Sequence, residues 1–99
     1  MRTLQELQDW YADQCNGTRE HTYGISIGTL DDNPGWLVKI DLAQTNLSNS
    51  VFPPRSKETS ESDWLRCSVT DNVFNGAGDP TKLETILRIF LDWSKSTVG

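Results

Sequence analysis

Cys15, His21 and Cys67 are the residues whose side chains could serve as nucleophile, general base or metal ligand. A catalytic thiol must be exposed as a thiolate and lie beside a positioned base. Cys15 instead falls on the apolar stripe of an expected helix, and His21 is the single histidine of the chain. A zinc site built from all three would lack the closely paired spacing of usual ligand sets. We therefore predict no catalytic residue, no metal centre and, in a chain that is not secreted, two thiols rather than a disulfide.

The segment from Gly76 to Pro80 contains two of the glycines of a phosphate-binding loop. It lacks the lysine and the full glycine pattern that such a loop needs. Asp79 suits a helix N-cap and Pro80 the first helical position, so the same residues predict a turn and a helix start. No pair of carboxylates is placed as an acid and a base. We expect a protein without a cofactor and without enzymatic activity.

Length and charge restrict the class of partner. The 99 residues include 14 acidic and 9 basic side chains, for a net charge of −5. Nucleic-acid binding needs clustered Lys and Arg, which the chain lacks. No apolar run approaches the ~20 residues that span a bilayer, and the N-terminus does not read as a signal peptide. We expect one cytoplasmic domain, residues 1–99, that binds neither nucleic acid nor membrane; its acidic excess would attract a basic protein, or serve solubility alone.

A β-hairpin over residues 21–42 is the clearest structural element of the sequence. Apolar and small or polar residues alternate along both arms, residues 21–30 and residues 36–42, which is typical of half-buried strands. Between the arms, Pro34 and Gly35 favour a tight reversal. Two strands are not stable alone, so other segments must cover them.

Two amphipathic helices are expected to provide that cover. The first spans about residues 4–15, with Thr3 and Glu6 as a capping box. The second begins at Pro80, after Asp79, and runs to about Ser94. Its buried stripe consists of Leu83, Ile86, Leu87, Phe90 and Trp93. Apolar residues at helical spacing favour packing of both helices on one surface.

Two further strands are predicted in the second half of the chain. Residues 63–70 alternate clearly, and residues 73–76 form a shorter strand joined to them as a hairpin. Residues 43–62 are largely polar and are interpreted as a long loop. Val51 and Phe52 are the apolar residues that could anchor this loop to the core or form a short edge strand.

The predicted fold class is α+β, with a four-stranded antiparallel meander and the element order α-β-β-β-β-α. Four strands make a sheet about 19 Å wide, which two helices about 10 Å in diameter would cover on one face. The opposite face would be polar apart from Leu37 and Trp64. Such a face is a candidate binding surface, although open antiparallel sheets are often simply solvated.

Several short segments recur in a characteristic order and spacing. They are Trp10-Tyr11, Gln14-Cys15, Tyr23 to Ile25, Asp32 to Trp36, Val38 to Leu42, Asp63-Trp64, Gly76 to Pro80 and Leu83 to Trp93. This pattern resembles the immunity protein 53 family of bacterial polymorphic toxin systems. The resemblance covers nearly the whole chain and is weakest over residues 44–60. It implies a small cytoplasmic antidote that binds a cognate toxin domain and blocks it, with no catalytic residues to carry over.

The predicted toxin-binding residues lie on the open face and at its rim. The face supplies Lys39, Asp41, Trp64 and Arg66, and the rim supplies Asp31, Asp32, Glu61 and Asp63. Trp and Arg are frequent binding hot spots, and an acidic rim would steer a basic toxin. Reversing Asp41 and Asp63 to lysine is expected to weaken binding without unfolding the domain. Trp36 and Trp93 lie in apolar stripes and are expected in the core.

Two other function classes remain compatible with the sequence. A regulatory or adaptor domain that binds a different cytoplasmic protein would share all of these features. A small-molecule site would need a pocket with converging polar groups, and the sequence shows no such set.

Overall fold

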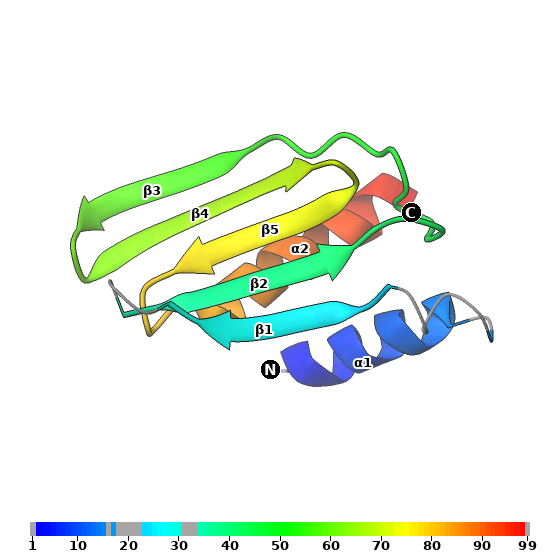
Figure 1. Cartoon of the computed structure of the whole chain (residues 1–99), viewed down its shortest axis with the longest axis horizontal. Coiled ribbons are helices and arrows are strands. Elements are labelled where there is room, and N and C mark those ends of the chain that lie inside the picture. Colours follow the sequence, from blue (N-terminus) through cyan, green and yellow to red (C-terminus); the bar gives the residue numbers. More distant parts are fainter. Residues whose placement is uncertain (1, 16, 18–22, 31–33, 99) are drawn as a thin grey trace.

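The computed structural model describes residues 2–15, 17, 23–30 and 34–98. It confirms the α+β class, with two helices and an antiparallel sheet; α2 lies behind the sheet and α1 runs alongside its β1 edge (Figure 1). The elements are α1 (Thr3–Gln14), β1 (Ile25–Thr29), β2 (Trp36–Asp41), β3 (Arg55–Ser60), β4 (Asp63–Thr70), β5 (Val73–Gly78) and α2 (Leu83–Val98). The helices leave the other face of the sheet uncovered (Figure 1).

The predictions of four strands and of a meander were wrong. The described sheet has five strands in the order β1-β2-β5-β4-β3, so the chain crosses from β2 to the far edge of the sheet. Residues 55–60, predicted as part of a loop, form β3 and pair with β4 from Arg55↔Cys67 to Ser60↔Asp63. All six residues of β3 are polar and exposed, so they show no apolar alternation that could have revealed a strand. Strand β5 also extends to Gly78, beyond its predicted end.

Aromatic side chains join the helices to the sheet. Phe90 of α2 meets Trp10 of α1 at a ring distance of 4.9 Å and Phe74 of β5 at 5.1 Å. Phe52 packs edge-to-face on Phe74 and on Trp93. Edge-to-face geometry is the favoured arrangement of such rings. The expectation that Phe52 anchors the chain between β2 and β3 is confirmed, and Trp93 is in the core as predicted.

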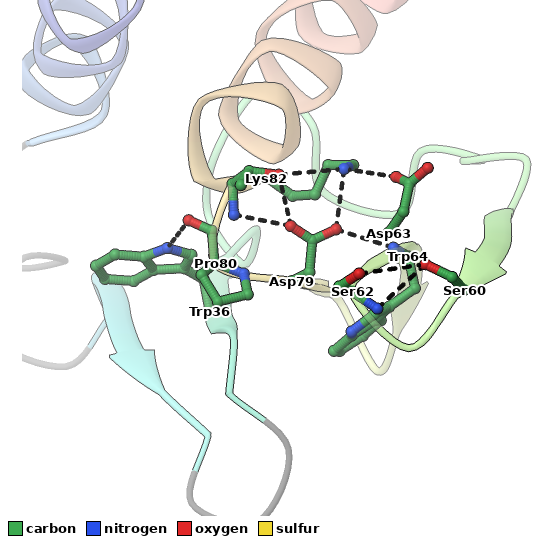
Figure 2. Close-up of polar contacts among 9 residues, drawn as sticks. Trp36, Ser60, Ser62, Asp63, Trp64, Asp79, Pro80 and Lys82 are labelled. Carbon is green, nitrogen blue, oxygen red and sulfur yellow. Dashed lines mark hydrogen bonds and ion pairs between the residues drawn. The ribbon is translucent and has the colours of Figure 1, made fainter.

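Val51 and Trp36 depart from their expected positions. Val51 is 84% exposed, and it contacts α2 through its carbonyl, which accepts the indole N–H of Trp93 at 3.0 Å. Trp36 is half-buried, and its indole N–H donates to the carbonyl of Pro80 at 3.0 Å (Figure 2). Each contact gives an indole N–H a hydrogen-bond acceptor, which the neighbouring apolar side chains cannot provide.

Gly35 allows the start of β2 to approach β5. A Cβ at this position would overlap the carbonyl oxygen of Gly78 and lie 3.3 Å from Cζ2 of Trp64. We expect Gly35→Ala to destabilise the protein by about 1–3 kcal/mol, the usual cost of overpacking. Gly28→Ala is the matched control, because a Cβ on Gly28 meets no atom within 4 Å. Urea unfolding of both variants measures the difference; equal stabilities would contradict the close approach.

The predicted capping box of α1 was wrong. Arg2 is the N-cap and makes no side-chain cap hydrogen bond, while Thr3 is already helical. The Thr3 hydroxyl is buried without a hydrogen-bond partner. Glu6 instead binds α2: its carboxylate accepts hydrogen bonds from Arg88 at 2.6 and 3.0 Å and pairs with Lys95. Glu6 thus adds ion pairs to the Trp10–Phe90 contact between the two helices and does not cap its own helix.

The Glu6 contacts make stability depend on pH. Hydrogen bonds from Arg88 and Lys95 lower the pKa of Glu6 from 4.5 to about 2. A carboxyl group whose pKa falls on folding stabilises the folded state above its unfolded pKa, and this contribution disappears as the pH falls through the folded pKa. We therefore expect Glu6→Gln to lower Tm at pH 7 by a few degrees (about 2–6 °C). The gap to wild type should close between about pH 4.5 and pH 2.

Thermal unfolding at several pH values tests this expectation. Asp13→Asn is the control, because Asp13 is also on α1 but is exposed. It should change Tm by no more than about 2 °C at neutral pH, as is usual for surface substitutions. A gap between Glu6→Gln and wild type that widens on acidification would have the wrong sign and refute the linkage.

Candidate binding surface

The strand register identifies the side chains of the open face. Phe74, Gly76 and Gly78 face α2, since Phe74 contacts Phe90 and a Cβ on Gly76 would overlap Ile86. Residues paired with these three positions share their face, and residues of the other parity point away. The outward set is Ser26, Gly28, Leu37, Lys39, Asp41, Ser56, Glu58, Trp64, Arg66, Ser68, Thr70, Val73, Asn75 and Ala77. The predicted polar face therefore exists, and β3 widens it.

Three open hollows form a row across this face. The first, about 560 Å³, lies at the β3–β4 turn and is lined by Glu58, Thr59, Ser60, Glu61, Trp64 and Arg66. The third, also about 560 Å³, lies between β1, β2 and β5 and includes Lys39, Asp41, Thr70, Val73 and Asn75. A middle hollow of about 370 Å³ shares Arg66 with the first and Asn75 with the third. The surface is thus corrugated along its width.

The structure divides five of the predicted contact residues between the outer hollows. Glu61, Trp64 and Arg66 line the first, and Lys39 and Asp41 line the third. Lys39 and Glu61 are exposed. Asp41 also has a structural contact, because its carboxylate accepts the backbone N–H of Gly24 at 2.9 Å and so holds the approach to β1. The predicted rim residues Asp31 and Asp32 lie outside the described residues.

Trp64 forms the floor of the first hollow. It points to the open face as predicted, but it is only 7% exposed. The guanidinium carbon of Arg66 lies 5.8 Å from the centre of its ring, and Arg66 also pairs with Glu58 at 3.1 Å. The indole N–H is buried without a hydrogen-bond partner. A partner would therefore meet the Arg66–Glu58 pair above the ring before it met Trp64.

Asp63 belongs to a polar cluster behind the first hollow (Figure 2). Its carboxylate lies 2.8 Å from the Lys82 ammonium, which also contacts Asp79 at 2.9 Å. The fully buried Asp79 carboxylate accepts the backbone N–H of Trp64 at 2.9 Å. It also accepts the N–H and hydroxyl of Thr81 at 2.8 and 2.6 Å. The cluster ties the start of β4 to the segment that precedes α2.

This cluster corrects the predicted helix start. Helix α2 begins at Leu83 rather than at Pro80, because Asp79 caps a separate turn in which the Lys82 N–H donates to the Asp79 carbonyl at 3.0 Å. Hydrogen bonds from Thr81, and then from Lys82, hold the pKa of Asp79 well below its usual value. The hydrogen bond from Lys82 likewise lowers the pKa of Asp63, and Asp63 in turn raises the pKa of Lys82. All three groups are therefore charged at neutral pH.

The two thiols differ in exposure. The prediction that Cys15 is buried was wrong: Cys15 follows the last residue of α1 and is exposed, with its thiol 3.4 Å from the carbonyl of Tyr11. Cys67 is buried, and this burial raises the pKa of its thiol to about 11. Both are free thiols. Within the described ranges, no group of three or more His, Cys, Asp or Glu side chains could hold a metal ion; His21 lies outside them.

Comparison with known protein families gives a match over nearly the whole chain. A family model described as Immunity protein 53 matches residues 4–95. The searches of curated proteins and of solved structures returned no significant match. For the part of the chain that the structure describes, neither helix has the length and apolar character needed to cross a membrane.

Proposed function

Because the chain belongs to the immunity protein 53 family, we propose that it binds a cognate bacterial toxin domain and neutralises it as a stoichiometric, non-enzymatic inhibitor. The observation that carries the proposal is the uncovered face of a five-stranded sheet with three adjoining hollows. We assign toxin contact to this face and its rim.

The face is large enough for a specific complex. Five strands at about 4.8 Å spacing and five to eight residues at about 3.3 Å rise give a surface of roughly 400–600 Å² before side-chain relief. With the turns at its rim the patch approaches the roughly 800 Å² per partner that is typical of stable complexes. The total accessible surface is 6075 Å², so the proposed interface would occupy about one eighth of it.

The charges of the face favour a partner of mixed polarity with a basic periphery. Lys39 and Arg66 lie on the face, and Arg66 is already paired with Glu58. Glu61 and Asp71 are exposed at opposite ends of the row of hollows. Acidic rim residues raise the association rate of a basic protein, and paired charges near the centre set its orientation.

Co-expression with a candidate cognate toxin domain tests the proposed function. Cells that express the toxin alone should stop growing, and cells that express both proteins should grow. The two chains should co-purify at a fixed stoichiometry, with the toxin inactive in the complex. If no complex forms and the toxin stays active, the proposal fails for this pair, and an adaptor role with a different cytoplasmic protein becomes the better explanation.

A further inference from the structure

Among the described residues, the backbone groups on the outer edge of β1 have no hydrogen-bond partner. The Asp41 N–H donates to the Gly24 carbonyl at 3.1 Å, and the Leu30 N–H donates to the Gly35 carbonyl at 3.0 Å. Hydrogen-bonded positions alternate along an antiparallel strand, so even-numbered residues of β1 bond to the hairpin partner and odd-numbered ones face outward. The described residues give these outward groups no hydrogen bond. They belong to Ile25, Ile27 and Thr29.

The two edges of the sheet differ in how they are protected. The β3 edge carries Arg55, Lys57 and Glu58 and has a register shift before Ser60. Charged side chains and bulges are the usual devices that stop an edge strand from pairing with another chain. The β1 edge, Ile25–Thr29, has no charged residue and an even register with β2. The β1 edge therefore lacks the charged side chains and the register shift that protect the β3 edge.

An apolar groove lies beside the β1 edge. In Figure 1, helix α1 lies below β1 and runs alongside it, from the middle of the strand to beyond the end at which the strand begins. A hollow of about 360 Å³ lies between α1 and the start of β1. It is lined by Leu7, Gln8, Tyr11, Tyr23, Gly24 and Ile25. Leu4 is 66% exposed and Ile27 is 42% exposed. Leu4, Gln8 and Tyr11 share one uncharged face of α1, which a sixth strand beside β1 would cover.

We propose that a second copy of this chain occupies this edge, with β1 pairing antiparallel to β1 about a two-fold axis at Ile27. Ile27 would then lie opposite Ile27 of the second copy, and Ile25 opposite Thr29. The two-fold axis repeats the Ile25–Thr29 pair on its other side, which gives three outward pairs. With two backbone hydrogen bonds per pair, the contact has about six. A two-fold interface requires a self-complementary surface, and a short strand with outward groups spaced evenly about its central residue meets that requirement.

Charge favours a second copy over a basic partner at this edge. Each chain has a net charge of −5, so repulsion disfavours contacts between two copies in which acidic side chains meet. Ile25–Thr29 and the Leu4, Gln8 and Tyr11 face contain no charged residue. A basic toxin would gain no Coulomb attraction there. The proposed dimer leaves both open sheet faces on the same side of a continuous ten-stranded sheet, so it does not compete with the proposed toxin site.

The size of the contact sets the expected affinity. A five-residue strand is only about 17 Å long, so the contact is smaller than the roughly 800 Å² per partner of a stable complex. We expect a dissociation constant on the order of 10–100 μM, in the range of weak, transient interfaces. The protein would be monomeric when dilute and dimeric when concentrated.

Sedimentation of the isolated protein from about 5 to 500 μM, which brackets the weak range expected for this contact, tests the proposal. Wild type should pass from monomer to dimer. Ile27→Lys should remain monomeric, because it places like charges opposite each other at the dyad. Val51→Lys is the control, since Val51 is an exposed apolar residue elsewhere, and it should dimerise like wild type. Wild type that stays monomeric throughout, or an Ile27→Lys variant that still dimerises, overturns the proposal.

Amide hydrogen exchange of wild type gives a second test that does not depend on how a variant folds. The outward N–H groups of Ile25, Ile27 and Thr29 should exchange at least about tenfold more slowly at the highest concentration than when dilute, because pairing removes them from water. The inward amides of β1 should change little. If concentration leaves the outward amides unprotected while toxin binding protects them, the edge belongs to the toxin and the dimer is refuted.

Discussion

Asp79→Ala is expected to destabilise the protein strongly, with a fall in Tm of roughly 10–20 °C. The Asp79 carboxylate is fully buried and accepts hydrogen bonds from Trp64, Thr81 and Lys82. Removing one partner from a buried charged network leaves the remaining groups without partners. The Trp64 N–H and the Lys82 ammonium would lose their buried acceptor together. Circular dichroism on heating measures the effect.

Asp63→Ala is the matched control for Asp79→Ala. Asp63 contacts the same ammonium group at 2.8 Å, but its side chain is 41% exposed, so water can replace it. The Tm of Asp63→Ala should fall by only a few degrees, about 2–5 °C. If the two variants lose equal stability, the buried hydrogen bonds of Asp79 are not the source of the effect. Because Asp79 holds the Trp64 backbone, Asp79→Ala should also weaken toxin binding, through the floor of the first hollow.

The parts of the fold that could be predicted from the sequence are those with apolar periodicity. The hairpin of β1 and β2 and the stripe of α2 follow from alternating or helically spaced apolar residues. Strand β3 could not be found this way, because all six of its residues are polar and exposed, and it is held to β4 by backbone pairing and by the Glu58–Arg66 ion pair. The local sequence pattern also does not show that β5 lies between β2 and β4. That position depends on contacts with distant residues, since Phe74 and Gly76 of β5 face α2.

The candidate surface was predictable in outline but not in its contacts. Strand parity placed Lys39, Trp64 and Arg66 on one face, as the register confirms. Strand parity does not tell how deeply a side chain is buried, so it did not reveal that Arg66 and its neighbours cover Trp64. Nor could it show that Asp63 reaches Lys82, which lies 19 residues away. The turn spacing of Asp79 and Lys82 was the one local signal of this cluster.

These contacts change which variants test the toxin-binding face. Asp41→Lys with Asp63→Lys would remove the hydrogen bond to Gly24 and the ion pair with Lys82, so any lost binding would combine surface and folding effects. Lys39 and Glu61 are both exposed, and they lie at the two ends of the face. Lys39→Glu with Glu61→Lys reverses both charges and leaves the net charge unchanged.

We expect Lys39→Glu with Glu61→Lys to weaken toxin binding about 100-fold, or roughly 2.7 kcal/mol, because each reversal replaces an attraction with a repulsion at the interface. Lys57→Glu with Glu84→Lys is the control. It makes the same charge changes on exposed residues of β3 and α2 that do not face the open side. Titration calorimetry should show less than about a threefold change for this control, as expected outside an interface. Equal losses in both double variants would indicate a response to charge in general, and a loss in the control alone would move the toxin to the helical side, where Arg55, Glu84 and Arg88 line a smaller hollow.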